Sequence, residues 1–266
     1  MSGLSETAYA KINLALHVRE RMADGYHRIE TIFAFCEDGD ELSAKLDDKL
    51  SLSLSGPFAE SLHPDENIVM KAALALRDAD QAATIHLRKS LPVASGVGGG
   101  SADAAAALRL LNELWELNWS AERLEAVARK LGADVPACVH SRAMRGAGRG
   151  DELEPVDLDL SETPVLLVNP RVALPTAEVF GRWGGVDRGP LTDWRHGRND
   201  LEAAATSLAP QIGGILAWLS AQTGAYCVRM SGSGATCFAL FESEAQRDRA
   251  TTAVPREWWR LATRLR

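Results

Sequence analysis

A glycine-rich segment, residues 96–101, constrains the fold of this chain more than any other feature. Four of its six residues are glycine, and a periodic apolar run follows with Ala104, Leu108, Leu111 and Leu114 on one helical face. Glycines let a backbone curl with its N–H groups inward, and a helix start adds free N–H groups and a positive dipole end. The combination predicts an anion site, and phosphate is the usual anion. A flexible turn is the alternative, but a linker seldom leads directly into such a helix.

This loop differs from two common nucleotide-binding motifs. No Lys-Ser or Lys-Thr pair closes it, which disfavours a P-loop NTPase. Ser101 stands where a dinucleotide-binding fingerprint needs Gly or Ala, which disfavours an NAD enzyme. Two roles remain open for Ser101: the N-cap of the following helix, or a hydroxyl near a metal ion and the phosphates.

Composition narrows the class of protein. The 266 residues are 46% hydrophobic with a formal net charge of −7, whereas a nucleic-acid binder usually has a basic excess. No segment approaches the ~18 uninterrupted apolar residues of a membrane span, and residues 1–10 do not resemble a signal peptide. The four cysteines form no CxxC pair, which predicts reduced core residues and a cytoplasmic location. The basic tail, residues 256–266, is predicted to be a solvated amphipathic segment.

The hydrophobic pattern mixes strands and helices without regular βαβ alternation, which favours an α+β fold. Strict alternation over residues 8–18 predicts a strand with Lys11 and Asn13 on the face opposite the apolar one. Further strands are expected at 29–35, 50–54, 83–88, 165–168, 226–230 and 236–241, and helices at 67–77, after residue 101, around 124–131, at 201–207 and at 212–223.

Two segments divide the chain or interrupt its pattern. A Gly- and Arg-rich stretch at 142–149, with the acidic stretch after it, suggests a seam between two domains, residues 1–155 and 156–266. Residues 181–199 are rich in Gly, Trp and Arg and are predicted to form a mobile loop.

Two charged residues are candidates for chemistry. Lys11 lies in a well-patterned strand, where it is either part of a solvated face or a fixed cation near a phosphate or a reacting hydroxyl. Asp134 precedes Val135-Pro136 and either caps a helix or takes the proton from a substrate hydroxyl.

A late Ser-Gly-Ser-Gly turn, residues 231–235, is typical of the closure of a hairpin between two strands.

In their order along the chain these features resemble the GHMP kinase superfamily of small-molecule kinases. Three motifs carry the resemblance: Ala10-Lys11-Ile12-Asn13-Leu14, the segment Pro92 to Ala105, and Met230-Ser231-Gly232-Ser233-Gly234-Ala235. Within the superfamily the chain is most similar to the members whose acceptor is 4-diphosphocytidyl-2-C-methyl-D-erythritol. That likeness rests on Ala10 to Asn13 with Asp24-Gly25-Tyr26-His27, the triple-glycine loop and Leu174-Pro175-Thr176.

The resemblance implies a fold and a reaction. The fold is a two-domain α+β GHMP kinase fold, with an N-terminal ribosomal-S5-like ATP domain, a C-terminal ferredoxin-like α/β sandwich and the active site in the cleft between them. ATP, with Mg²⁺, phosphorylates the 2-hydroxyl of the methylerythritol unit in the non-mevalonate isoprenoid pathway. The small-molecule acceptor is the expected partner, without nucleic acid or membrane, in a monomer or weak homodimer.

The resemblance also implies roles for individual residues. Asp134 matches the general base, and Lys11 matches the cation that orients the hydroxyl and offsets charge. The acceptor contacts are matched by Asn13, Tyr26, His27, Thr176 and Phe180. Among them Tyr26 and Phe180 stack on the two faces of the cytosine, and His27 forms a hydrogen bond with its edge. ATP-binding residues are Asn67, near the adenine, and Pro92, Val93, Ala94, Ser95, Gly96, Val97, Gly98, Gly99, Gly100, Ser101 and Ala102.

Two rival functions stay open at this stage. Another GHMP kinase, acting on mevalonate, homoserine or a sugar, would share the three motifs, although a stacking Tyr26 suits a nucleobase better than a small polyol. A nucleotide- or RNA-binding module without catalysis would need only the loop. The net negative charge and the joint presence of Lys11 and Asp134 weigh against that second rival.

Overall fold

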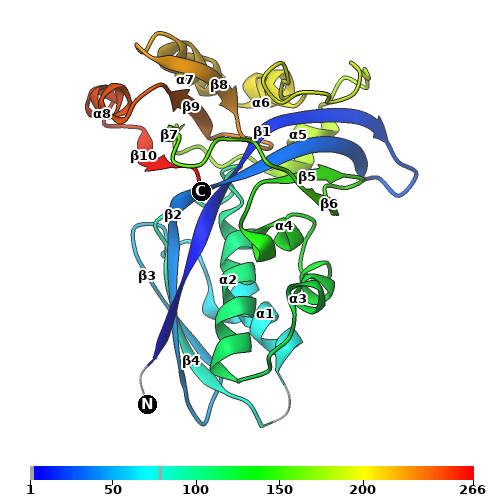
Figure 1. Cartoon of the computed structure of the whole chain (residues 1–266), viewed down its shortest axis with the longest axis vertical. Helices are drawn as coiled ribbons and strands as arrows, with labels where there is room; N and C mark the ends of the chain where they lie inside the picture. The colour runs from blue at the N-terminus through cyan, green and yellow to red at the C-terminus, as the bar shows by residue number, and fades with distance from the viewer. Residues whose placement is uncertain (1–2, 78–79) are drawn as a thin grey trace. The chain divides into compact units, whose positions relative to one another are not determined.

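A computed structural model describes residues 3–77 and 80–266 (Figure 1). The chain forms two compact units: unit 1 contains Met1–Ala10, Asp38–Val93 and Gly98–Ser141, and unit 2 contains Lys11–Glu37, Ala94–Val97 and Arg142–Arg266. Two long paired strands, β1 (Leu4–Arg21) and β2 (His27–Leu46), contribute to both units. The strands predicted at 8–18 and 29–35 lie within them.

Unit 1 combines a sheet with an α-helical layer. The C-terminal half of β2 pairs antiparallel with β4 (Ala83–Arg88), and β3 (Ser51–Ser55) runs parallel to β4. The helices are η1 (Pro64–Glu66), α1 (Ile68–Leu76), α2 (Gly99–Leu114), α3 (Ala121–Ala128) and α4 (Val135–His140). Helix α2 buries Ala104, Leu108 and Leu111, as its periodicity predicts. It begins at the glycine-rich loop, so the core of unit 1 fixes the helical end of that loop.

Unit 2 contains a four-stranded sheet that follows a βαββαβ order. Its strands are β7 (Pro164–Asn169), β8 (Ala225–Met230), β9 (Cys237–Phe241) and β10 (Trp259–Arg264), paired antiparallel in the order β10-β7-β9-β8. Helices α5 (Thr176–Gly181), α6 (Glu202–Leu208) and α7 (Gln211–Ser220) connect β7 to β8, and α8 (Glu244–Ala253) connects β9 to β10. This connectivity is ferredoxin-like, as expected for the C-terminal part.

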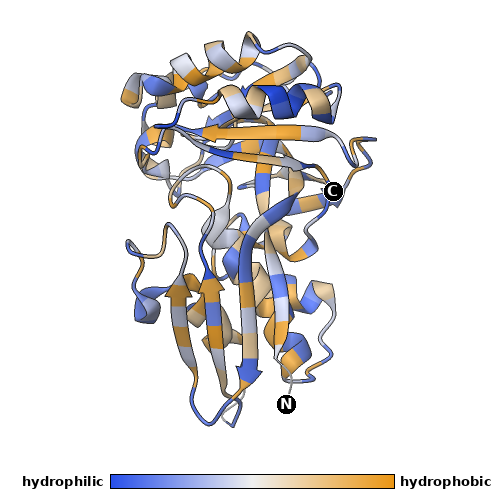
Figure 2. Ribbon diagram, turned by 90° about the vertical axis from the view of Figure 1, so that its left-hand side faces the viewer, coloured by the Kyte–Doolittle hydropathy of each residue, from blue (hydrophilic) through white to orange (hydrophobic). Residues whose placement is uncertain are grey.

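The rest of unit 2 builds on the long strands. Strand β5 (Met144–Ala147) pairs antiparallel with β2 and with β6 (Glu152–Pro155). The core buries residues from several elements around the ferredoxin-like sheet, including Leu166, Val168, Ile212, Ile215 and Phe241. Figure 2 shows apolar residues concentrated along the strands and on parts of the helices. All four cysteines are buried and none forms a disulfide, as predicted.

The C-terminal tail corrects a prediction. Instead of a solvated amphipathic segment it forms the edge strand β10, with Trp259 opposite Asn169 of β7. Trp259, Thr263 and Leu265 are buried, whereas Arg260 is exposed. The tail therefore alternates like a half-buried strand, but its arginines conceal that alternation in the sequence.

No helix among residues 3–77 and 80–266 is both long and apolar enough to cross a bilayer.

Candidate active site

The glycine-rich loop has residues in each unit, because Ala94–Val97 belong to unit 2 and the chain from Gly98 belongs to unit 1. Gly96 and Gly98 have φ angles of 81° and 64°, in the left-handed region that favours glycine. Helix α2 starts at Gly99, so the free N–H groups of its first turn immediately follow the loop. The N-cap is Gly98, and Ser101 lies inside the first turn. The prediction that Ser101 could be the N-cap is therefore wrong, and its hydroxyl is available for another role.

The Ser-Gly-Ser-Gly turn holds the first half of this loop. It connects β8 to β9, as the hairpin interpretation predicts, and contains a cis Gly234–Ala235 peptide bond. The hydroxyl of Ser231 donates to the carbonyl of Gly96 at 2.8 Å. A Cβ atom on Gly96 would collide with the carbonyl oxygens of Ser231 and Gly234, so only glycine allows this approach. The third motif is therefore a structural support for the first half of the loop.

Lys11 lies on β1 beside the same loop, and its backbone N–H donates to the carbonyl of Val97 at 2.9 Å. Its side chain is only 2% exposed, so the solvated-face alternative is wrong. The ammonium donates to Asn13 Oδ1 at 2.9 Å and lies 5.3 Å from the ring centroid of Phe33. A buried ammonium needs such partners, because removing an unpaired charge from water costs on the order of several kcal/mol or more. Lys11 is thus a fixed, largely desolvated cation.

Asn13 is held in turn by a residue that sequence reasoning missed. Its amide nitrogen donates to Thr31 Oγ1 at 2.8 Å, and the Thr31 hydroxyl donates to the carbonyl of Ala15 at 2.7 Å. Both side chains are buried. This relay fixes the amide so that its oxygen faces Lys11. The only sequence signal for Thr31 is a polar residue inside an otherwise apolar run of β2.

Two predicted residues lie in unit 1. Asp134 occupies the N-cap position of α4, but its side chain makes no capping hydrogen bond. Asn67 is an N-cap with such a bond, because its Oδ1 accepts from the N–H of Val69 at 2.9 Å. The capping interpretation therefore accounts for Asn67 but not for the carboxylate of Asp134.

The predicted base-binding residues cluster in unit 2. The His27 ring packs against Phe180, with centroids 4.9 Å apart, and meets the edge of Trp183 at 5.6 Å. Burial, together with the charge of Arg21, lowers the pKa of His27. Its Nε2 is buried without a hydrogen-bond partner in the structure. A neutral imidazole with an unsatisfied polar atom is suited to a ligand that offers a matching group. Sequence reasoning missed Trp183.

Tyr26 directly precedes His27 in the chain, and it is more than half exposed. The guanidinium of Arg149 lies 4.3 Å from the centroid of its ring, and Arg149 also pairs with Asp24. Asp24 accepts a hydrogen bond from the Tyr26 N–H at 2.9 Å, which closes the turn. The ring is therefore held by its own turn and by a cation on one face.

Thr176 and Phe180 both lie on α5, one helical turn apart. The Thr176 hydroxyl is 3.0 Å from that of Ser233 in the Ser-Gly-Ser-Gly turn. The structure therefore brings Phe180 to His27, and Thr176 to the turn that supports the glycine-rich loop.

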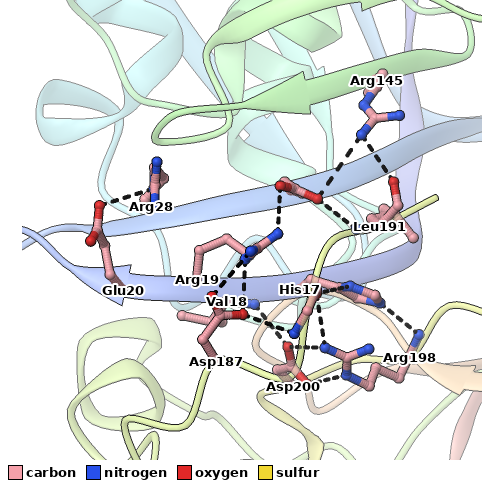
Figure 3. A network of polar contacts seen from close by, with 12 residues as sticks. His17, Val18, Arg19, Glu20, Arg28, Arg145, Asp187, Leu191, Arg198 and Asp200 are labelled. Atoms are coloured by element: carbon pink, nitrogen blue, oxygen red, sulfur yellow. Dashed lines mark hydrogen bonds and ion pairs between the residues drawn. The ribbon is translucent and has the colours of Figure 1, made fainter.

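The loop between α5 and α6 has no regular structure, as predicted, but it is anchored to β1 and β2. Arg19 donates to Glu30 at 2.8 Å and to Asp187 at 3.0 Å, so it joins this loop to both strands. The N–H of Leu191 donates to the other oxygen of Glu30 at 2.6 Å, and Arg145 donates to the Leu191 carbonyl (Figure 3). These contacts argue against the predicted mobility of residues 181–199.

Metal ligands are sparse. In the part of the chain that the structure describes, no group of three or more His, Cys, Asp or Glu side chains is arranged to hold an ion. Mg²⁺ in kinases is usually bound through one or two protein groups plus the phosphates of the nucleotide. The hydroxyl of Ser101, freed from capping, suits that mode, so the residues present fit an Mg²⁺ that arrives with ATP.

Comparison with known proteins agrees with this arrangement. Residues 67–142 match the family model "GHMP kinases N terminal domain", and residues 189–261 match "GHMP kinases C terminal". The 4-diphosphocytidyl-2-C-methyl-D-erythritol kinase of Rhizorhabdus wittichii is 55% identical, over 98% of this chain and 94% of the relative. The kinase of the same name from Novosphingobium aromaticivorans is 53% identical, over 99% and 93%. A crystal structure of 4-(cytidine 5'-diphospho)-2C-methyl-D-erythritol kinase superposes with a TM-score of 0.83 at 32% identity, covering 98% and 99% of the two chains.

Both family models, the ferredoxin-like C-terminal sheet and the loop at the start of α2 define a GHMP kinase, an enzyme that transfers a phosphoryl group to a small-molecule alcohol. The expected α+β GHMP fold is thereby confirmed, and the reading as a binding module without catalysis is excluded. Within that class the chain belongs to the family of 4-diphosphocytidyl-2-C-methyl-D-erythritol kinases.

Proposed function

We propose that this enzyme transfers the γ-phosphoryl group of ATP to the 2-hydroxyl of 4-diphosphocytidyl-2-C-methyl-D-erythritol, giving the 2-phosphate and ADP for isoprenoid precursor synthesis. The observation that carries the proposal is the 55% identity, over nearly the whole chain, to a relative of that name. In the reaction the acceptor oxygen forms a bond to the γ-phosphorus, the bond from that phosphorus to the β–γ bridging oxygen breaks, and the hydroxyl proton leaves to a base.

The carboxylate of Asp134 is the proposed base. Its lack of a capping hydrogen bond supports this role, because the helix it begins does not account for a carboxylate there. Lys11 is the proposed partner that orients the acceptor hydroxyl and offsets charge in the transition state. Its burial and its contact with Asn13 support that role, since a desolvated, immobile cation stabilises charge better than a solvated one.

The ATP phosphates are proposed to bind the N–H groups of residues 92–102. The left-handed glycines and the first turn of α2 support this assignment. Bound with ATP, Mg²⁺ neutralises part of the phosphate charge, and Ser101 is the residue that we assign to it. Phosphoryl transfer asks little covalent work of a protein, so positioning and charge stabilisation account for most of the catalysis. Asn67 is proposed to lie near the adenine in addition to capping α1.

The cytosine is proposed to bind at Tyr26, His27 and Phe180, with Asn13 and Thr176 as further acceptor contacts. The neutral His27 ring with its unsatisfied Nε2 supports recognition of a base edge, and the exposed ring of Tyr26 supports stacking. This aromatic set also favours the cytidyl acceptor over mevalonate, homoserine or a sugar, since a small polyol offers no ring to stack.

Three broader assignments accompany this function. We propose two domains with a boundary near residue 155, a monomer or weak homodimer, and a cytoplasmic location. The four buried cysteines, none of them in a disulfide, support the last of these, because reduced thiols are typical of that compartment.

A turnover assay with several alcohols tests the proposal. ADP release is measured with the cytidyl acceptor, mevalonate, homoserine and galactose at equal concentration. We expect turnover with the cytidyl acceptor alone. Turnover of homoserine or mevalonate in its absence would falsify the acceptor assignment while leaving the GHMP kinase class intact.

A further inference from the structure

The two ends of the glycine-rich loop are joined by a buried ion pair that the proposed mechanism does not use. Here the loop is taken with its flanks, as the segment 92–102 that is proposed to bind the phosphates. Lys89 lies three residues before Pro92, its first residue, and Asp103 directly follows Ala102, its last. The Lys89 ammonium donates to Asp103 Oδ2 at 2.7 Å and also pairs with Asp40 of β2. The side chains of Lys89, Asp40 and Asp103 are 3%, 0% and 3% exposed.

Asp40 extends this network along the backbone that enters the loop. Its Oδ1 accepts hydrogen bonds from the N–H groups of Ser90, at 2.5 Å, and Leu91, at 2.8 Å. Leu91 is the residue immediately before Pro92. One carboxylate therefore fixes the main chain up to the first residue of the loop.

The ammonium also lies directly against the start of α2. A Cβ atom on Gly99 would lie 3.0 Å from Lys89 Nζ, closer than side-chain atoms normally approach. Gly99 is the first residue of α2, and Asp103 lies one turn later. Lys89 directly follows β4, before the loop, and its ammonium thus contacts both β2 and the first turn of α2 after the loop.

Stability alone does not account for this arrangement. Two carboxylates share one buried ammonium, and burial together with the charge of Asp40 raises the pKa of Asp103 to about 7 although Lys89 opposes the shift. Asp103 Oδ1 is buried without a hydrogen-bond partner in the structure. Apolar residues often stabilise such a site equally well, so a buried ion pair is weak evidence for a role in stability alone.

We propose that Lys89 is a positioning residue that, by bridging Asp40 and Asp103, fixes the separation of the two ends of the glycine-rich loop and so keeps its N–H groups aimed at the phosphates of ATP. The inference rests on the kinase activity, but not on the identity of the acceptor. The bridge acts on ATP, not on the alcohol. Its loss therefore weakens ATP binding and leaves the KM of the acceptor unchanged.

Variants of Asp103 test this role in the full-length enzyme. Asp103→Leu removes the bridge to α2 and leaves Lys89 and Asp40 as a balanced pair, whereas Asp103→Asn keeps an acceptor for Lys89. Asp103→Ala serves the same purpose as the Leu variant without adding apolar volume. The control is Arg88→Met. Arg88 is the residue before Lys89, and the substitution breaks its exposed ion pair with Glu41. ATP affinity is measured by calorimetric titration without any acceptor, alongside both KM values and the thermal midpoint.

We expect Asp103→Leu and Asp103→Ala to raise the Kd and KM of ATP about 10-fold, the order of one charged hydrogen bond. Asp103→Asn is expected to stay within about 2-fold of wild type, and Arg88→Met to change nothing. The proposal is overturned if the Leu and Ala variants lower the thermal midpoint but bind ATP normally, which is the result of a merely structural role. It is also overturned if Asp103→Asn binds ATP as weakly as they do. Because the titration contains no acceptor, these outcomes are independent of the alcohol that the enzyme uses.

Discussion

The ammonium of Lys11 donates to the side-chain oxygen of Asn13 at 2.9 Å, two residues further along the same buried face of β1. The alternation of a strand puts both side chains on one face, and Thr31 of β2 orients the amide through a 2.8 Å hydrogen bond. Strand geometry and a neutral amide thus help to hold the ammonium in one position on the buried face of β1.

Replacing Lys11 with Met is expected to lower kcat by about 10²- to 10³-fold, the cost of removing one preorganised charge from an active site. Methionine keeps most of the buried volume, so the loss reflects the charge. Lys45→Met, on the exposed C-terminal part of β2, is the matched control and is expected to leave kcat unchanged. Steady-state kinetics decide the matter: a Lys11→Met enzyme with more than a tenth of wild-type kcat contradicts the assigned role.

Asp134→Asn separates catalysis from helix capping. We expect kcat to fall about 10²- to 10⁴-fold, as for the loss of a general base, while ATP still binds. Helix α4 loses no capping bond in this variant, because the carboxylate makes none. Ser120→Ala is the opposite control. Ser120 caps α3 by accepting from the N–H of Arg123 at 3.4 Å, so its loss costs about 1 kcal/mol of stability without lowering kcat. An Asp134→Asn enzyme that unfolds early but turns over normally is a cap variant, and the base must be sought elsewhere.

The local motifs were predictable from sequence because each depends on neighbouring residues. Glycines at 96 and 98 adopt the left-handed conformations that their composition suggests, alternation located Lys11 and Asn13, and Asn67 is an N-cap as expected. The site contacts that were missed join distant segments. Thr31 is 18 residues from Asn13, and nothing within its own strand pattern indicates that partner.

Strand lengths and the tail were underestimated for a different reason. The β2 strand continues through Glu37-Asp38-Gly39-Asp40, residues with poor strand propensity. Gly39 is tolerated because the backbone of Ala8 approaches it closely, and Asp40 because Lys89 and two N–H groups satisfy it. In β10 the arginines obscure the alternation of Trp259, Leu261 and Thr263. Tertiary contacts overrode propensity in both strands, which a single sequence does not display.

The ring of Tyr26 is expected to determine acceptor affinity. Tyr26→Leu should raise the KM of the cytidyl acceptor about 10-fold or more, since stacking on a base is worth about 1–3 kcal/mol, while the KM of ATP stays constant. Tyr226→Leu removes another exposed tyrosine, in β8, and is the matched control. Initial rates at varied acceptor concentration measure the effect. An equal change in the two variants, or a change confined to ATP, argues against a base site at Tyr26.

Trp259→Ala tests whether the tail is part of the folded core. Trp259 is 9% exposed and lies opposite Asn169 of β7, so its truncation is expected to destabilise the protein by about 3 kcal/mol. Arg260→Ala changes an exposed neighbour on the same strand and is expected to cost less than about 0.5 kcal/mol. Denaturant unfolding compares them, and a Trp259→Ala midpoint equal to wild type contradicts a packed β10.

His17 couples the anchored loop to pH. Its Nδ1 lies 3.1 Å from the carbonyl of Gly189, which can only accept, and its Nε2 accepts from the N–H of Arg198 at 3.3 Å, so the ring is neutral (Figure 3). Burial, and then the charge of Arg198, lower the pKa of His17, although Asp200 and Glu30 oppose the shift. As the pH falls below the ordinary histidine value of about 6.5, the unfolded chain takes up a proton before the folded one does. Stability is therefore full above that pH and is lost as the pH falls through the folded-state pKa.

A His17→Gln variant is expected to lack this acid sensitivity. Glutamine offers a donor and an acceptor but does not titrate. Between pH 7.5 and 5 the thermal midpoint of the wild type should fall relative to His17→Gln by about 2 to 4 °C, the effect of roughly 1 kcal/mol in a chain of this size. His196→Gln changes an exposed histidine in the same loop and should follow the wild-type curve. If the midpoints of all three proteins decline in parallel across this range, protonation of His17 does not release the loop.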